Sequence, residues 1–222
     1  MQPQPHDIEY ARRQMVEQQV RAWEVLDPRV LDTLATVPRE DFVPAAYRGI
    51  AFADTQIPLG HGEVMMAPKV EGRLLQALAI RPEDRILEIG TGSGFLTACL
   101  ARLGREVVSV DIHGDFVAAA GDKLRAHGIT NVSLETRDAS RPDWAAERFD
   151  VIAVTGSLPV LDEGWRRRLT VGGRLFVVVG EPPVMEALLV TRVSEDAWSQ
   201  ESLFETVIPP LRNVPRPVRF VL

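Results

Sequence analysis

The stretch Ile86-Leu-Glu-Ile-Gly-Thr-Gly-Ser-Gly94 decides the fold of this chain. Its apolar first half indicates a buried strand, and a helical pattern begins directly after it, near Phe95. The turn between them holds three alternate glycines, which allow the backbone to approach a ligand closely. In open α/β sheets, ligands bind beyond the carboxyl ends of the strands, at the point where the strand order reverses. The stretch therefore predicts the first strand-to-helix turn of such a sheet and a position for a nucleotide-like ligand.

Downstream of this turn, short apolar runs alternate with segments of helical period, as a parallel sheet covered by helices requires. The predicted strands are 85–89, 106–110, 132–135, 150–154 and 174–179, and the predicted helices are 95–103, 116–127 and 160–169. Gly104 and Gly128 supply stop signals for two of these helices. Two further runs, 186–193 and 199–208, predict an antiparallel hairpin. The fold class is α/β: a Rossmann-like, doubly wound, mostly parallel sheet with an antiparallel C-terminal hairpin and a helical N-terminal extension.

The first third of the chain indicates helices and irregular segments. Asp7 is placed to cap a helix over 8–22. Asp27 and Pro28 predict the cap and first turn of a helix over 29–36, because proline is well tolerated at the first helical position.

The stretch 51–68 breaks this pattern with prolines and glycines and no period, which predicts a loop before a helix over 69–79. A long loop inside a compact domain is usually functional or disordered. We therefore expect an N-terminal extension with a functional loop at 1–79 and the ligand-binding α/β core at 80–222, together one compact unit. The proline-rich end, 209–217, predicts an extended tail.

Composition and charge exclude several classes of function. The 222 residues include 25 Lys and Arg and 31 Asp and Glu, which gives a net charge of −6. The chain therefore lacks the excess of basic residues that binding to nucleic-acid phosphates requires. Cys99 is the single cysteine, so no internal disulfide or multi-thiolate zinc site is expected, and a reducing cytoplasm fits. His6, His113 and His127 have no partner at metal-ligand spacing, so we expect no metal. No stretch approaches the roughly 20 apolar residues that span a bilayer, and we expect neither export nor membrane association.

The spacing of the glycines narrows the class of nucleotide-like ligand that the turn can bind. Dinucleotide-binding turns have G-x-G-x-x-G, whereas here the glycines fall at 90, 92 and 94, with Glu88 inside the preceding strand. Asp111 ends the next strand about 20 residues on, where a carboxylate can accept both hydroxyls of a ribose. The ligand is therefore expected to contain a ribose but no pyrophosphate. The competing interpretation is a glycine-rich turn that binds nothing.

The pattern Glu-x-Gly-x-Gly-x-Gly followed by that acid resembles class I S-adenosyl-L-methionine-dependent methyltransferases. The stretches 27–43, 51–62, 149–155, 171–175 and 204–211 resemble the protein-L-isoaspartate O-methyltransferase family, a likeness that covers about 15–211. The resemblance implies S-adenosyl-L-methionine as cofactor, S-adenosyl-L-homocysteine as product, and an isoaspartyl-containing peptide or protein as substrate. The cofactor-binding residues it implies, with Asp138 and Ala139 at the adenine, are Glu88, Gly90, Thr91, Gly92, Ser93, Gly94, Asp111, Ile112, Asp138, Ala139 and Thr155.

The resemblance also implies a substrate loop, formed by Pro58, Leu59, Gly60, His61, Gly62, Glu63, Val64, Met65, Met66 and Pro68. This sequence departs from the family there, because Val64 replaces the family's threonine and Met66 its active-site serine. The family's Gly-Asp-Gly after the third strand is Arg137-Asp-Ala139, and its usual glutamate at the second strand end is Asp111. No catalytic residue is therefore assigned.

The hydroxyls that are lost at Val64 and Met66 would affect activity by positioning the substrate carboxylate. An isoaspartyl carboxylate, with a pKa of about 4, is ionised at pH 7 and attacks the methyl group without a general base. Orientation then carries the catalysis, and Met66 cannot donate a hydrogen bond to the carboxylate. Glu63 would repel the substrate if it faced it. The sequence therefore predicts weak or absent isoaspartyl methylation, or an altered substrate.

Two alternatives to isoaspartyl methylation stay open at this point. The first is methyl transfer to another small acceptor, with Met65 and Met66 marking an apolar site. The second is a protein that binds the cofactor without turnover.

Overall fold

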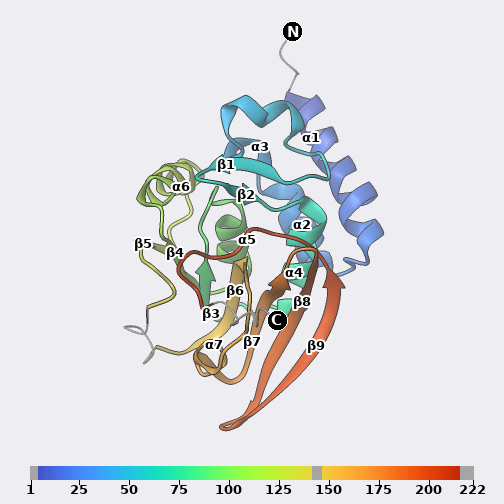
Figure 1. The fold of residues 1–222 in the computed structure, drawn as a ribbon. Helices are drawn as coiled ribbons and strands as arrows, with labels where there is room; N and C mark the ends of the chain where they lie inside the picture. Colours follow the sequence, from blue (N-terminus) through green and yellow to red (C-terminus); the bar gives the residue numbers. More distant parts are fainter. Residues whose placement is uncertain (1–4, 142–146, 216–222) are drawn as a thin grey trace.

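Seven strands form the central sheet of the computed structural model, which describes residues 5–141 and 147–215 (Figure 1). The spatial order is β5-β4-β3-β6-β7-β8-β9. The strands are β3 (Arg85–Ile89), β4 (Glu106–Asp111), β5 (Val132–Thr136), β6 (Phe149–Leu158), β7 (Leu169–Glu181), β8 (Val184–Ser194) and β9 (Ala197–Glu205). Strands β3 to β7 pair in parallel, and β8 and β9 add an antiparallel hairpin at the β7 edge. The predicted fold class is confirmed.

The strand order reverses beside β3, the first strand of the sheet in the chain. From β3 the chain moves outward to β4 and β5, and it then returns to β6 on the other side of β3. The carboxyl end of β3 therefore lies at a topological switch point, where ligands of such sheets bind.

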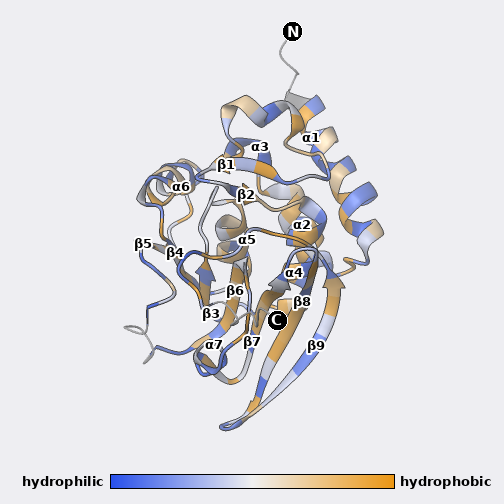
Figure 2. Ribbon diagram, viewed as in Figure 1, coloured by the Kyte–Doolittle hydropathy of each residue, from blue (hydrophilic) through white to orange (hydrophobic). Residues whose placement is uncertain are grey.

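Both faces of the sheet are buried, each by its own apolar cluster. Alternate residues of one strand point to opposite faces and therefore belong to different clusters. Ile86 belongs to one apolar cluster, with side chains from α4 (Pro68–Leu78), α5 (Phe95–Leu103) and the N-terminal segments. Leu87 belongs to a second cluster, which includes Trp165 and is covered in part by Leu211. Figure 2 shows this apolar character along β6, β7 and β8.

The N-terminal segments share the first of these clusters with the sheet. They comprise α1 (Pro5–Met15), a π-helical turn (Val16–Val20), a 3-10 turn (Arg21–Trp23), α2 (Pro28–Thr36), α3 (Arg39–Phe42) and a second 3-10 segment (Ala45–Ile50). Asp27 caps α2 as predicted, its side chain accepting a hydrogen bond from the Arg29 backbone N–H. The helix predicted over 8–22 is α-helical only as far as Met15.

Two predictions of local structure are wrong. The loop predicted over 51–68 contains a hairpin of β1 (Ile57–Gly60) and β2 (Glu63–Met65), which pair only with each other. The helix predicted over 160–169 is reduced to α7 (Glu163–Arg166), because the buried Leu169 already begins β7. The remaining predicted helices are present as α4, α5 and α6 (Gly114–Ala126).

The tail predicted to be extended over 209–217 is extended at 209–211 but turns at Arg212 and Asn213, where Asn213 has φ +59°; residues 209–213, here called the closing segment, pack against the sheet. Leu211 N–H donates to Ser157 O and Ser157 N–H donates to Pro209 O, each at 2.9 Å. Residues 216 and 217 lie outside the described part of the chain. In residues 5–141 and 147–215, no helix has the length and apolar character that crossing a membrane requires.

Candidate functional site

A cleft of about 680 Å³, partly open to solvent, lies at the carboxyl ends of the parallel strands. We call it the strand-end cleft. Its walls come from the ends of β3, β4 and β6, the residues after β5, the β1–β2 hairpin and the closing segment, and include Leu59, Glu63, Val64, Gly90, Gly92, Asp111, Ile112, His113, Phe116, Arg137, Asp138, Ala139, Thr155, Gly156, Leu211 and Arg212.

Two of the three glycines in the turn are required by their protein neighbours. Gly90 has φ +99°, and a Cβ there would lie 2.1 Å from the Thr155 hydroxyl oxygen. That hydroxyl lies 2.9 Å from Ile89 O and 2.8 Å from Gly90 O, so it holds the loop from β6. Gly94 has φ +83°, and a Cβ there would lie 2.9 Å from the Cβ of Ala120 in α6. Close packing against protein therefore explains these two glycines, and Gly92 faces the cleft.

Asp111 is a fixed carboxylate at the end of β4, and it is buried. Its Oδ2 accepts a hydrogen bond from Gly92 N–H and its Oδ1 accepts one from His113 N–H, both at 2.9 Å. A carboxylate has about four lone-pair positions, so two acceptor positions remain for a ligand in the cleft. This arrangement suits a pair of ribose hydroxyls, and Ile112 lies exposed at the rim beside it.

Asp138 lines the next part of the cleft, beside Ala139. Its Oδ1 accepts hydrogen bonds from the backbone and hydroxyl of Ser140, and its Oδ2 accepts one from Asn213 at 2.8 Å. Partial burial raises the pKa of Asp138, but the hydrogen bonds from Ser140 and Asn213 outweigh it and leave the pKa below its usual value. The carboxylate is therefore a charged, oriented acceptor.

Glu88 lies behind the glycine turn, fully buried in β3. One of its oxygens accepts hydrogen bonds from the hydroxyls of Thr97 and Ser109, and Ser109 bonds to Thr91 in the turn. Burial raises the pKa of Glu88 to about 8, although the two hydroxyl hydrogen bonds oppose this. The structure thus connects Glu88 to the cleft only through these hydroxyls, whereas the resemblance implied that it binds the cofactor.

A smaller cleft continues from the strand-end cleft beneath the β1–β2 hairpin, and we call it the hairpin cleft. Its walls include Leu59, Val64, Met65, Met66, Glu71, Thr91, Ser93 and Leu96. Val64 and Met66, at the positions of the family's hydroxyls, both line it, so this wall is apolar. Glu63 lines the strand-end cleft, but Arg212 pairs with it at 2.7 Å and offsets its charge.

Other predicted loop residues lie away from the two clefts. Pro58, Gly60 and Gly62 are exposed on the hairpin, and Pro68 is buried at the start of α4. His61 lies at the exposed turn, where its Nε2 is 2.9 Å from Asp115 Oδ2. None of these five residues lines either cleft.

Sequence reasoning missed the closing segment as part of the site. Arg212 donates to Glu63 and to the His61 carbonyl oxygen, and Asn213 donates to Asp138. The signal that could have indicated this packing is the apolar pair Ile208 and Leu211 around two prolines, directly after the last strand.

The sequence spacing also concealed a group of possible metal ligands. His61, His113 and Asp115 each offer one ligand atom, and these three atoms lie within 4.8 Å of one another. His61 is remote from the other two in sequence, so only the fold brings them together.

Comparisons with known proteins agree with this geometry. The family model for protein-L-isoaspartate(D-aspartate) O-methyltransferase matches residues 10–213. A protein-L-isoaspartate O-methyltransferase of Methylorubrum extorquens is 37% identical over 214 residues, covering 96% of this chain and 93% of that protein. Its counterpart from Koribacter versatilis is 35% identical over 200 residues, covering 90% of each chain.

A solved structure shares the fold. The crystal structure of a putative protein-L-isoaspartate O-methyltransferase from Plasmodium falciparum, in complex with S-adenosyl-L-homocysteine, has a TM-score of 0.79 at 20% identity, covering 90% of this chain and 98% of that chain. The family match over nearly the whole chain, together with the strand-end cleft, leads to one conclusion: the chain belongs to the protein-L-isoaspartate(D-aspartate) O-methyltransferase family of class I methyltransferases.

Proposed function

We propose that this protein transfers the methyl group of S-adenosyl-L-methionine to the free carboxylate of an isoaspartyl residue in a peptide or protein. The observation that carries the proposal is the junction of two clefts. The fixed acceptors Asp111 and Asp138 line the strand-end cleft, and the β1–β2 hairpin covers the adjoining cleft in a chain of this family.

The residues of the strand-end cleft fit the cofactor by their donor and acceptor chemistry. Asp111 would accept the ribose hydroxyls, Asp138 and Ala139 would contact the adenine, and the turn from Gly90 to Gly94 would face the methionine part. Glu88 would act on this turn from behind. S-adenosyl-L-methionine, when bound, supplies an electrophilic methyl group.

The hairpin cleft would position the substrate. An ionised carboxylate needs no base, so the chain must hold it in line and exclude water. Val64 and Met66 provide an apolar wall for this task but no hydrogen bond. Polar side chains also line this cleft, and they are Glu71, Thr91, Ser93 and Thr155.

The apolar wall is the one observation that favours another small acceptor. The family match over residues 10–213 favours the isoaspartyl acceptor instead, and it includes both the hairpin and the cofactor turn. Turnover is likewise expected rather than cofactor binding alone. We place the reaction in the cytoplasm, because a sequence with a single cysteine, Cys99, fits a reducing compartment.

Transfer of labelled methyl from S-adenosyl-L-methionine to an isoaspartyl peptide tests the proposal, with the matched aspartyl peptide as control. We expect turnover on the isoaspartyl peptide only. Cofactor binding without turnover on it, or turnover on an unrelated small acceptor alone, would contradict the proposal.

The double substitution Val64→Thr and Met66→Ser tests the role of the apolar wall. A hydrogen bond to a charged group contributes about 1.5–3 kcal/mol, so a restored hydroxyl is expected to raise kcat/KM about tenfold or more. Val184→Thr, on an exposed part of β8, is the control and should leave the rate unchanged. An unaltered rate in the double variant would show that other groups orient the substrate.

A further inference from the structure

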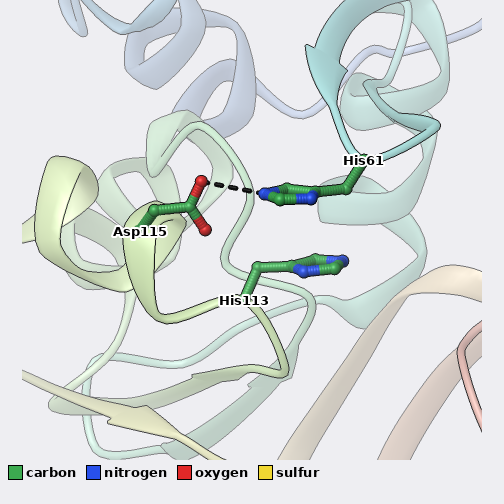
Figure 3. A group of neighbouring side chains, drawn as sticks. All are labelled: His61, His113 and Asp115. Carbon is green, nitrogen blue, oxygen red and sulfur yellow. Dashed lines mark hydrogen bonds and ion pairs between the residues drawn. The ribbon is translucent and has the colours of Figure 1, made fainter.

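Two histidines and an aspartate converge where the β1–β2 hairpin meets the start of α6 (Figure 3). The rings of His61 and His113 are stacked, with centroids 4.1 Å apart and planes 5° from parallel. Asp115 approaches from α6, and its Oδ2 lies 2.9 Å from His61 Nε2. His61, which the resemblance placed in the substrate loop, and Asp115 line neither of the two clefts.

The backbone that carries this cluster is held on both sides. His61 has φ +55° at the hairpin turn, and its carbonyl oxygen accepts a hydrogen bond from Arg212 at 2.6 Å. The His113 N–H donates to Asp111 at the end of β4. The two imidazoles are therefore presented by fixed segments, while the His61 side chain, 45% exposed, can still rotate.

His113 has an unsatisfied nitrogen in this cluster. Its Nε2 is buried and has no hydrogen-bond partner among the described residues. Glu63 Oε1 is 3.8 Å from it, which is beyond hydrogen-bond reach. Glu63 is therefore not yet the hydrogen-bonded carboxylate that usually orients a metal-binding histidine, and it would take that place only by moving closer to Nε2.

We propose that His61, His113 and Asp115 form a binding site for a divalent transition-metal ion of the zinc class. Two imidazoles and one carboxylate are a set that Zn²⁺ accepts, with water completing the coordination. Zinc lies about 2.0–2.2 Å from each ligand atom, so two ligand atoms of a tetrahedral site are about 3.4 Å apart. The three atoms lie within 4.8 Å of one another, so they would have to approach by up to about 1.4 Å, and the two parallel rings would have to turn so that their lone pairs converge. A tilt of the His61 ring out of the stack would direct its lone pair at the ion.

The metal would join the hairpin to α6 next to Asp111. His61 belongs to the turn of the hairpin that covers the substrate side, and His113 is two residues from Asp111. A bound ion would therefore tie the hairpin to the start of α6. The site stands on its own geometry, and its metal binding can be measured without cofactor or substrate.

Calorimetric titration of the chelator-treated protein with ZnCl₂ at pH 7.5 tests the site. We expect one Zn²⁺ per chain, with at least tenfold weaker binding in His61→Ala and in Asp115→Asn. Both side chains are largely exposed, so these variants should fold. His127→Ala is the matched control, because His127 pairs with Asp41 elsewhere, and it should bind as the wild type does.

Three outcomes would overturn the proposal: no zinc binding by the wild type, binding by His61→Ala and Asp115→Asn equal to that of the wild type, or an equal loss in His127→Ala. A rise in thermal unfolding temperature on adding ZnCl₂ gives a second readout, expected in the wild type and in His127→Ala only.

Discussion

Gly90 occupies a position that suits glycine alone, because its φ is +99° and a Cβ would lie 2.1 Å from the Thr155 hydroxyl oxygen. Gly90→Ala adds left-handed backbone strain of about 1–2 kcal/mol and overpacking of about 1–3 kcal/mol. We expect the free energy of unfolding to fall by about 2–5 kcal/mol, measured by urea denaturation.

Gly128→Ala is the matched control for Gly90→Ala. Gly128 also has positive φ, +67°, but nothing lies within 4 Å of its would-be Cβ. Gly128→Ala should therefore lower the free energy of unfolding only by the cost of the backbone strain, about 1–2 kcal/mol. Equal losses in the two variants would show that Thr155 moves aside at no cost.

Glu88 makes stability depend on pH, since burial raises its pKa from 4.5 to about 8. The folded state binds this proton more tightly than the unfolded chain does. The stabilisation is complete below about pH 4.5 and is lost as the pH rises through 8, by an amount on the order of a few kcal/mol. Glu88→Gln cannot ionise, so its free energy of unfolding should rise relative to that of the wild type between about pH 4.5 and pH 8, and the difference should level off above pH 8.

Urea denaturation at several pH values measures this difference for Glu88→Gln. Glu201→Gln, on the exposed part of β9, is the control and should follow the wild-type profile. If Glu88→Gln also follows that profile, the carboxyl is hydrated or ionised in the folded protein.

At the scale of elements, one buried ion pair connects α3, α4 and the end of the hairpin. Arg39 of α3 is fully buried and pairs with Glu71 of α4. It also donates to Met66 O at 2.8 Å and to Ala51 O at 2.9 Å. Burial raises the pKa of Glu71, but Arg39 lowers it in part and cannot lose its own proton, so Glu71 serves as the counter-ion.

Glu71→Gln would leave the Arg39 guanidinium buried without a counter-ion. We expect a loss of about 3–5 kcal/mol in the free energy of unfolding, because the desolvation of the remaining charge is no longer offset. Glu17→Gln breaks the exposed pair with Arg21 and should cost less than about 1 kcal/mol. Similar losses in both variants would mean that water reaches Arg39.

The elements that sequence reasoning predicted correctly carry local signals. The cap at Asp27 marks α2, and the apolar run with its glycine turn marks β3 and α5. The β1–β2 hairpin has no such local signal, because Pro58 and the neighbouring glycines are typical of loops. Its two strands also pair only with each other among the described residues. In α7, tertiary packing of Leu169 into the sheet prevailed over the helical period.

The site shows the same division between local and distant signals. Asp111 could be predicted, because strand ends of a parallel sheet meet at one edge. Arg212 could not, since it contacts Glu63 across 149 residues of sequence. Neither could the approach of His61 to Asp115, which depends on how the hairpin packs on α6.

At the scale of the whole molecule, the β1–β2 hairpin and the closing segment meet over the strand-end cleft. The closing segment joins the hairpin through Arg212 and joins the residues after β5 through Asn213. Hairpin, sheet and C-terminal segment therefore surround one space. The cleft is partly open to solvent, so we expect these contacts to slow the departure of a bound ligand rather than to block it.

Arg212→Ala should speed the release of S-adenosyl-L-homocysteine from this space. The Arg212–Glu63 pair is half exposed and contributes less than about 1 kcal/mol, but the hydrogen bond to His61 O adds a second tie to the hairpin. A combined loss of about 1.4 kcal/mol corresponds to roughly tenfold faster dissociation, measured by stopped-flow chase with excess cofactor.

Glu63→Gln removes only the ion pair and should therefore have a smaller effect on release than Arg212→Ala. The double variant should resemble Arg212→Ala, because once Arg212 is absent Glu63 has lost this partner. Arg167→Ala, which breaks an exposed pair with Glu163 on α7, should leave release unchanged. If Arg212→Ala releases product at the wild-type rate, the closing segment does not retain the ligand, and opening of the hairpin alone would set the rate.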